Sequence, residues 1–163
     1  MAAKAGKTNA VRLVERAGIA HELRSYDLSM DDFNAEAVAE LIGVPASQVF
    51  KTLVTEGANG ACFAVVPADA ELDLKALAHA AGERKMAMMA VKDVEPLTGY
   101  RRGGVTALGS RKTLPVFLDS SAQLHDRIGV SAGTKGLQLM IAPDAYVQLT
   151  NAVSAPLTRP ASP

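Results

Sequence analysis

A single lysine lies in the middle of a strongly apolar stretch. Lys51 follows the run Gln-Val-Phe and precedes the run Thr-Leu-Val. β-Branched and aromatic residues in such a run predict a strand, on whose two-residue period Lys51 shares a face with Val49 and Leu53. Because lysine is very rarely buried without a partner, Lys51 either reaches a cleft or carries its ammonium outward along its apolar stem.

Two glycine-rich segments, residues 98–112 and 132–136, are the other candidates for chemistry. Glycine lets backbone N–H groups converge on an anion or a carbonyl oxygen, because no Cβ blocks the approach and a positive φ costs little. Such a nest could serve as an oxyanion hole or hold a phosphate. The first segment also carries four cations: Arg101, Arg102, Arg111 and Lys112. Each segment alone could equally be a turn with a solvated run of charge.

Spacing argues against three common catalytic sites. The histidines have no Cys or His neighbours at zinc-site intervals, so no metal is expected; they are His21, His79 and His125. Residues 104–109 have the glycine spacing of a phosphate loop, but Ser110 and Arg111 follow where Lys and Ser/Thr are required. The chain also lacks the Gly-x-Ser-x-Gly motif of serine hydrolases.

Composition favours one globular domain without a membrane span. The chain has 163 residues, is 48% hydrophobic, and carries 17 basic and 17 acidic side chains. Its one cysteine, Cys62, lies in an apolar run and is expected to be a small core residue in a reducing compartment. With no secretory segment and no apolar run of about 18 residues, the expected location is the cytoplasm.

Hydrophobic periodicity and capping residues predict alternating helices and strands between a flexible leader, residues 1–7, and a disordered tail, residues 153–163. Residues 8–152 are expected to form the domain. Helices are expected at residues 8–17, 35–42 and 74–81, with a short helix or turn at 90–97 and a last helical turn at 144–149. Strands are expected at 21–26, 47–56, 61–67, 84–89, 115–119, 128–131 and 137–142.

Four motifs occur in an order that is typical of one family. They are Val-Phe-Lys-Thr-Leu at 49–53, the glycine-rich segment at 98–109, Leu-Pro-Val-Phe-Leu-Asp at 114–119 and Val-Ser-Ala-Gly-Thr-Lys-Gly-Leu at 130–137. From about residue 11 to residue 149 the chain resembles the YbaK/EbsC family of aminoacyl-tRNA deacylases, which is related to the editing domain of bacterial prolyl-tRNA synthetases. The resemblance implies a single compact α+β domain, with a curved mixed, largely antiparallel β-sheet flanked by helices.

The resemblance also implies a set of site residues. Carried over by position, the catalytic residues are Lys51, Gly103 and Gly104, and the substrate-binding residues are Tyr26, Phe33, Thr52, Ser131, Gly133 and Gly136. Arg101, Arg102, Arg111 and Lys112 are expected to contact tRNA, and no cofactor is expected. Two positions depart from the family pattern: Ala107 stands where many members have proline, and Gln138 stands where many have aspartate.

The resemblance to the free-standing YbaK branch implies removal of cysteine from tRNA(Pro). A synthetase pocket separates cysteine from proline by only about 1–3 kcal/mol, so a second site is needed. No general base stands near Lys51 in sequence, which fits attack by the substrate's own thiol on its ester. Water attack on Ala-tRNA(Pro), a non-catalytic module that binds tRNA or a synthetase, and a small-molecule binding protein are the alternatives. The expected partners are tRNA(Pro) and prolyl-tRNA synthetase, without membrane or DNA.

Overall fold

The fold is α+β, as expected, in a computed structural model that describes residues 7–160. The helices are α1 (Asn9–Arg16), α2 (Ala35–Ile42), α3 (Leu74–Ala81), α4 (Val91–Thr98) and α5 (Pro143–Thr150). Short 3-10 helices are η1 (Met30–Asp32), η2 (Ala46–Gln48) and η3 (Ser120–Leu124). The strands are β1 (His21–Ser25), β2 (Phe50–Gly57), β3 (Gly60–Pro67), β4 (Ala70–Leu72), β5 (Ala87–Met88), β6 (Val116–Asp119), β7 (Ile128–Ser131), β8 (Leu137–Ile141), β9 (Val153–Ala155) and β10 (Thr158–Pro160). No helix in residues 7–160 is long and apolar enough to cross a bilayer.

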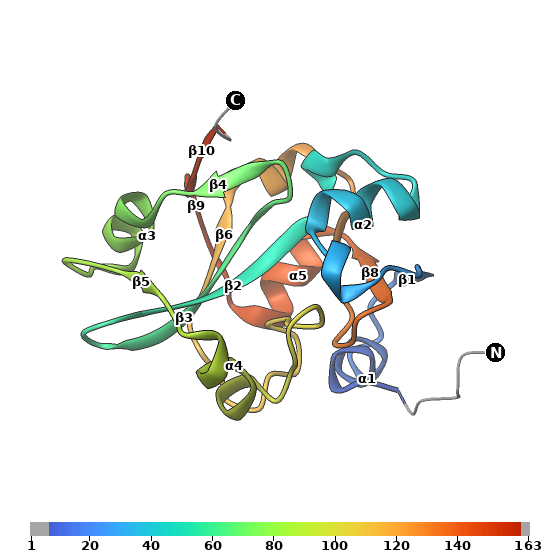
Figure 1. Ribbon diagram of the computed structural model, residues 1–163, viewed down its shortest axis with the longest axis horizontal. Helices are drawn as coiled ribbons and strands as arrows, with labels where there is room; N and C mark the ends of the chain where they lie inside the picture. The colour runs from blue at the N-terminus through green and yellow to red at the C-terminus, as the bar shows by residue number, and fades with distance from the viewer. Residues whose placement is uncertain (1–6, 161–163) are drawn as a thin grey trace.

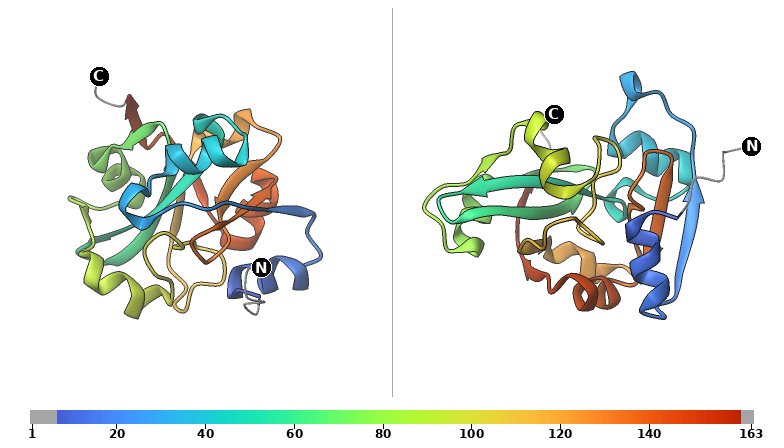
Figure 2. Two further views of the ribbon diagram at one scale, coloured as in Figure 1. Left: turned by 45° about the vertical axis from the view of Figure 1, so that its right-hand side comes forward. Right: turned by 90° about the horizontal axis from the view of Figure 1, so that it is seen from below.

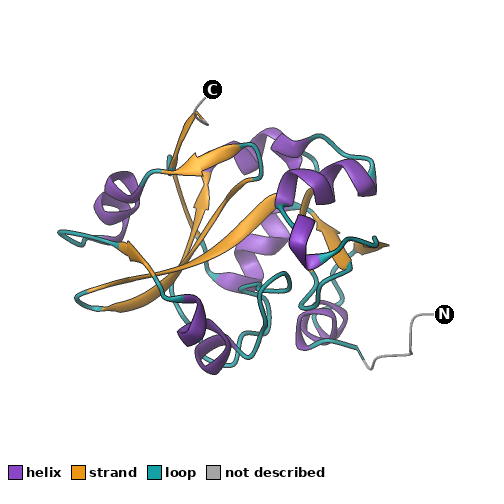
Figure 3. Cartoon of the chain, viewed as in Figure 1, coloured by secondary structure: helices purple, strands orange, loops and turns teal. Residues whose placement is uncertain are grey.

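The strands form three sheets, and most of their pairs are antiparallel, which confirms the expected mixed, largely antiparallel α+β architecture with helices beside the sheets (Figure 1, Figure 3). In the five-stranded sheet, β2 lies between β5 and β3, and β6 and β9 extend the sheet in parallel beyond β3. A three-stranded antiparallel sheet has the order β1-β8-β7. The bridge between Val49 and Gly129 joins the start of β2 to β7, so the two sheets meet beside Lys51.

The β2-β3 hairpin is the centre of the core. Gly57 pairs with Gly60 across a tight turn, and from this turn the register runs back to Phe50 opposite Pro67. Because side chains alternate along a strand, Phe63 and Val65 pack into one cluster with Tyr146 of α5. Cys62, Ala64 and Val66 pack into another cluster with Leu77 and Ala78 of α3. The hairpin is thus covered on both faces, and β2 is held rigidly.

The predicted helix boundaries follow from local capping. The side chains of Thr8, Asn34 and Asp73 each accept a hydrogen bond from a backbone N–H of the first turn that follows. The helices α2 and α3 end at Gly43 and Gly82, which have φ of 77° and 70°. Each of these contacts joins residues that are close in the sequence, so the local sequence alone predicts them.

The C-terminal segment corrects the expected tail. Residues 153–155 form β9 beside β6, and residues 158–160 form β10 beside β4. Leu157 between them is fully buried, and its N–H donates to Oδ1 of Asp119 over 2.8 Å. One buried leucine and one buried carboxylate therefore order a segment that its prolines and low apolar content had suggested to be disordered. The strand expected at 84–89 is reduced to the two residues of β5. Residues 161–163 of the tail and 1–6 of the leader lie outside the described residues.

Candidate functional site

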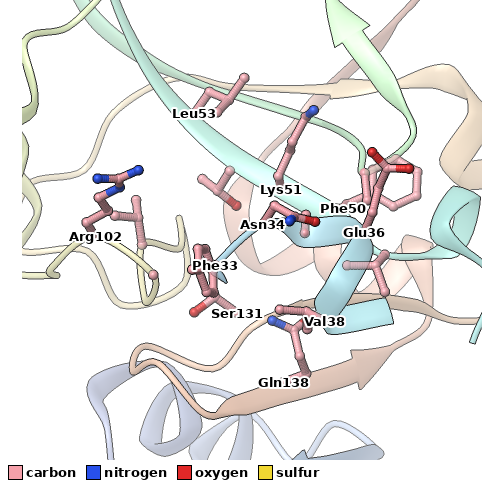
Figure 4. Close-up of a pocket in the computed structure, with 16 residues that line it drawn as sticks. Phe33, Asn34, Glu36, Val38, Phe50, Lys51, Leu53, Arg102, Ser131 and Gln138 are labelled. Carbon is pink, nitrogen blue, oxygen red and sulfur yellow. The ribbon is translucent and has the colours of Figure 1, made fainter. Parts of the chain in front are cut away.

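A pocket of about 370 Å³ lies where β2, α2, the first glycine-rich segment and the ends of β7 and β8 meet (Figure 4). Six of the residues expected in the site line it: Phe33, Lys51, Thr52, Arg102, Gly103 and Ser131. The remaining lining residues are Asn34, Ala35, Glu36, Val38, Val49, Phe50, Leu53, Ala68, Val105 and Gln138. The larger share of the pocket surface is therefore apolar, as is common for small-ligand sites, but seven of the sixteen lining residues have polar or charged side chains.

Lys51 is the second residue of β2 and is half-buried. In Figure 4 it extends from the strand in the same direction as Leu53, in agreement with the two-residue period. Its neighbour Phe50 points into the core, where its ring meets His125 edge-on at 6.4 Å. No carboxylate within residues 7–160 pairs with Lys51, although Glu36 lines the same pocket. The ammonium thus remains available to a ligand.

Two buried polar atoms of the pocket lining lack a hydrogen bond of normal geometry within the described part of the chain. They are Oγ1 of Thr52 and Oε1 of Gln138, and the Gln138 side chain belongs to a residue that is only 5% exposed. A buried acceptor without a donor costs about 1–3 kcal/mol. A ligand that donates to these oxygens would recover that free energy, so the pocket is prepared for a polar group.

Tyr26 does not line the pocket but lies directly beside Gln138. Its N–H donates to the carbonyl of Gly136 over 2.9 Å, which fixes the start of the loop after β1 against the second glycine-rich segment. Burial raises the pKa of the Tyr26 phenol, and the nearby Gly136 backbone and Gln138 side chain act in the opposite direction. The phenol therefore stays protonated at physiological pH, beside the Gln138 side chain of the pocket lining.

The glycines of the two segments are needed because the segments contact each other. An added Cβ on Gly104 would lie 2.7 Å from Cα of Thr134, and one on Gly133 would lie 2.9 Å from the ring of Tyr100. Figure 2 shows the first segment beside the loop between β7 and β8. Of the expected catalytic pair, Gly103 lines the pocket whereas Gly104 lines an adjoining hollow.

The four cations expected to contact tRNA do not form one patch. Arg102 lines the pocket, and Arg101 lies 3.2 Å from Glu95 in an exposed ion pair. Arg111 donates to the carbonyl of Pro96 at the end of α4 over 3.1 Å. Lys112 lines a separate cavity beside Cys62. The sequence places these residues in one segment, but the turns of that segment distribute their side chains over different surfaces.

Sequence reasoning did not identify the contribution of α2. Asn34 and Glu36 at its start and Val38 on its buried face all line the pocket. Oδ1 of Asn34 accepts a hydrogen bond from the N–H of Ala37 over 2.8 Å, so the capping residue that starts the helix also forms the pocket wall. The capping signal was visible in the sequence, but the direction of the helix was not.

Cys62 is buried, as expected, and its Sγ lies 3.1 Å from Oγ1 of Thr55. Burial raises the pKa of the thiol, so the thiolate that a nucleophile requires is disfavoured. Within residues 7–160, no three side chains of the kinds that bind metal ions come together.

Comparisons with known proteins find consistent relatives. The family model described as "Aminoacyl-tRNA editing domain" matches residues 32–149. A protein of Enterococcus faecalis (strain ATCC 700802 / V583), named "Putative Cys-tRNA(Pro)/Cys-tRNA(Cys) deacylase EbsC", is 44% identical over 93% of both chains. A proline–tRNA ligase of Fervidobacterium nodosum (strain ATCC 35602 / DSM 5306 / Rt17-B1) is 35% identical over 37% of this chain and 10% of its own. A crystal structure described as that of "a putative trans-editing enzyme for prolyl tRNA synthetase" superposes with a TM-score of 0.81 and 26% identity, over 93% of this chain and 97% of the other.

Proposed function

The chain belongs to the aminoacyl-tRNA editing domain family, and from this premise we propose that it clears mischarged Cys-tRNA(Pro). It is an aminoacyl-tRNA deacylase; the aminoacyl group, the tRNA and the mechanism are the proposal. The observation that carries the proposal is the half-buried Lys51, which has no carboxylate partner within residues 7–160 and stands at the wall of a small pocket.

The size and lining of the pocket support a small aminoacyl group. A volume of about 370 Å³ accommodates a short side chain with its ester and part of the terminal ribose. Val38, Val49 and Leu53 supply apolar surface for a side chain such as that of cysteine. The buried oxygens of Thr52 and Gln138, which have no hydrogen bond of normal geometry within residues 7–160, are suitable acceptors for the α-ammonium group of the aminoacyl ester.

The proposed reaction needs no protein nucleophile. The thiolate of the substrate attacks its own ester carbonyl, so that a C–S bond forms and the bond from that carbon to the ribose oxygen breaks. The leaving oxygen takes up a proton, which gives tRNA with a free hydroxyl and a cyclic thiolactone. Lys51 and the backbone N–H of Gly103 would stabilise the negative charge that develops on the carbonyl oxygen. The remaining wall holds the thiol close to its target, which is a large part of the rate acceleration.

The decisive experiment measures amino-acid release by the purified protein from four substrates: Cys-tRNA(Pro), Cys-tRNA(Cys), Ala-tRNA(Pro) and Pro-tRNA(Pro). Fast release from Cys-tRNA(Pro), lost when the substrate thiol is blocked by alkylation, is the expected result. Release of alanine at a higher rate would instead assign water attack and a hydrolase. Equal rates on both cysteinyl-tRNAs would extend the substrate to the second tRNA named for the E. faecalis relative. No release from any of the four would refute the proposal and favour a non-catalytic module.

Replacement of Lys51 tests its role in the reaction. Lys51→Ala should lower kcat/KM for Cys-tRNA(Pro) by about 10²- to 10³-fold, as removal of one oxyanion donor does. Because Lys51 is only half-buried and is not part of a core cluster, the melting temperature should change little. Lys75→Ala, at an exposed lysine of α3, is the control. A folded Lys51→Ala protein with normal kcat/KM would rule out the assignment.

Prolyl-tRNA synthetase is the proposed partner. The chain has equal numbers of basic and acidic residues, so its own affinity for tRNA is expected to be low, and a synthetase that holds the same tRNA would raise the effective concentration. Sedimentation velocity of a mixture of the deacylase, the synthetase and tRNA(Pro) tests this. If the deacylase sediments in the mixture at the same rate as it does alone, the three components do not form a complex. A cytoplasmic location stays a prediction.

A further inference from the structure

A second hollow, of about 680 Å³, opens beside the pocket and has a different character. It is formed by the end of α4, the first glycine-rich segment and the loop between β7 and β8. Its charged lining residues are Arg101, Arg102, Lys135 and Glu95, so three cations face one carboxylate. The protein as a whole has no net charge. Positive charge is therefore concentrated at this place.

The only carboxylate in the lining does little to neutralise the hollow. Nε of Arg101 lies 3.2 Å from Oε2 of Glu95, with side chains that are 86% and 55% exposed. An ion pair with this exposure contributes little to stability, and a phosphate can replace the carboxylate as the partner of Arg101. Arg102 and Lys135 are also exposed and have no ion-pair partner within residues 7–160. Up to three cations are thus available to an anion.

The pocket and the hollow share one lining residue. Arg102 lines both spaces. Of the two residues that follow it, Gly103 lines the pocket and Gly104 lines the hollow. The close approach of Gly104 to the backbone of Thr134 brings the two glycine-rich segments together, and a Cβ on Gly103 would lie 3.5 Å from Cβ of Lys135, so Lys135 lines the hollow near Arg102. A ligand whose end occupies the pocket has the hollow within reach on the side of Arg102. Figure 4 shows Arg102 on the side of the pocket away from α2.

We propose that this hollow binds the phosphodiester groups of the nucleotides that precede the esterified terminal nucleotide of the substrate, with Lys135 and Arg101 as phosphate ligands. The inference rests on the proposed function, because it takes the aminoacyl ester to lie in the pocket. It adds Lys135, which comes from the other glycine-rich segment, to the tRNA-binding residues. It also separates Arg101 and Arg102 from Lys112, which lines a different cavity, and from Arg111, whose guanidinium donates to the carbonyl of Pro96.

The test compares two substrates that share the ester and differ in phosphate. Cysteinyl-tRNA(Pro) carries the phosphodiester chain, whereas 3′-O-cysteinyl adenosine carries none. Lys135→Gln should raise KM for the tRNA about three- to tenfold at low salt and reduce the dependence of log kcat/KM on log salt by about 0.7, the value for one phosphate contact on a single strand. For the adenosine ester, kcat/KM should change by less than about twofold, because no phosphate contact exists to lose.

A variant with the opposite expected effect on KM, and control variants at lysines outside the hollow, complete the comparison. Glu95→Gln removes the competing carboxylate and should lower KM for the tRNA at low salt, while Lys75→Gln on α3 serves as the exposed control. Lys112→Gln should raise KM less than Lys135→Gln does, because Lys112 lines a different cavity. An equal loss in Lys135→Gln on both substrates, or an equal effect of Lys112→Gln, would overturn the inference.

Direct binding separates this inference from the proposed function. A fluorescently labelled CCA ribotrinucleotide, which has two phosphodiester groups, should bind the wild-type protein more tightly than it binds the Lys135→Gln variant. Inorganic phosphate should compete with it only weakly. If the wild-type protein released amino acid from neither ester, the proposed function would fail, and the trinucleotide would still decide on the hollow. Equal trinucleotide affinity of the two proteins would refute the phosphate site.

Discussion

At the residue scale, the buried polar atoms of residues 7–160 without a hydrogen-bond partner include two in the pocket and one in the core, and these differ in their consequence. Thr52 and Gln138 line the pocket, where a ligand can supply the missing hydrogen bond. The hydroxyl of Tyr146 also has no partner within residues 7–160, but Tyr146 is fully buried in the main core cluster. Burial raises the pKa of its phenol, so the group stays protonated. The buried hydroxyl therefore lowers the free energy of unfolding without a compensating hydrogen bond.

Tyr146→Phe should therefore leave the free energy of unfolding unchanged or raise it by up to about 1 kcal/mol, because it removes an unsatisfied buried group and keeps the ring. The control is Tyr100→Phe. The Tyr100 hydroxyl donates to the carbonyl of Leu108 over 2.7 Å, so its removal should cost about 1 kcal/mol. Urea titration measures both. A loss in Tyr146→Phe as large as in Tyr100→Phe would mean that the Tyr146 hydroxyl has a partner.

The residues of the pocket differ in how visible they are in sequence. Lys51 is conspicuous because a cation in an apolar strand needs an explanation, and the family resemblance adds Phe33 and Ser131. Glu36 and Val38 carry no such signal, since a helix with one apolar face is equally consistent with any packing direction. Residue type could thus identify the chemical group of the site, but most of its apolar wall needed the three-dimensional arrangement.

At the scale of elements, the two glycine-rich segments act as one unit. Gly104→Ala would place a methyl group 2.7 Å from Cα of Thr134, and a backbone atom cannot move aside as a side chain can. The segments should separate, with a loss of about 1–3 kcal/mol in stability and a fall in kcat/KM. The control, Gly129→Ala, adds the same methyl group next to the flexible end of Met140, 3.1 Å from its Sδ. A Gly104→Ala protein as stable and active as the control would contradict this account.

Helices and strands were predictable to the extent that their signals are local. Thr8, Asn34 and Asp73 cap their helices through contacts two or three residues away, and the β2-β3 hairpin is joined by a short glycine turn. The strands β9 and β10 pair instead with β6 and β4, which lie far away in sequence. Three-residue strands without an alternating pattern give no sign of such partners. The C-terminal segment was for this reason expected to be disordered.

At the scale of the whole molecule, Asp119 joins the C-terminal segment to the centre of the fold. The carboxylate is 4% exposed; Oδ1 accepts from the N–H of Leu157, and Oδ2 accepts from the N–H and the hydroxyl of Ser121. Asp119→Ala leaves these donors unpaired and should lower the free energy of unfolding by about 2–4 kcal/mol. It should also speed amide exchange in β9 and β10.

Asp126→Ala, at an exposed carboxylate in the loop before β7, is the control for charge alone. Hydrogen exchange read out by mass spectrometry reports the C-terminal segment separately from the rest. Unchanged protection of residues 153–160 in Asp119→Ala, together with unchanged stability, would show that the buried leucine holds the segment by itself.

The walls of the pocket come from segments that are distant in the chain: Phe33 and α2 from one part, β2 from a second, and Ser131 and Gln138 from a third. A ribosome that synthesises this chain exposes Lys51 long before the opposite wall exists. A product of proteolysis or premature termination that ends before β7 carries the lysine on an open strand, without the enclosure that discriminates among esters. Editing activity and substrate discrimination should therefore arise together, in one late folding event. A fragment that ends before β7 lacks Ser131 and Gln138 of the pocket wall and should release amino acid from no aminoacyl-tRNA.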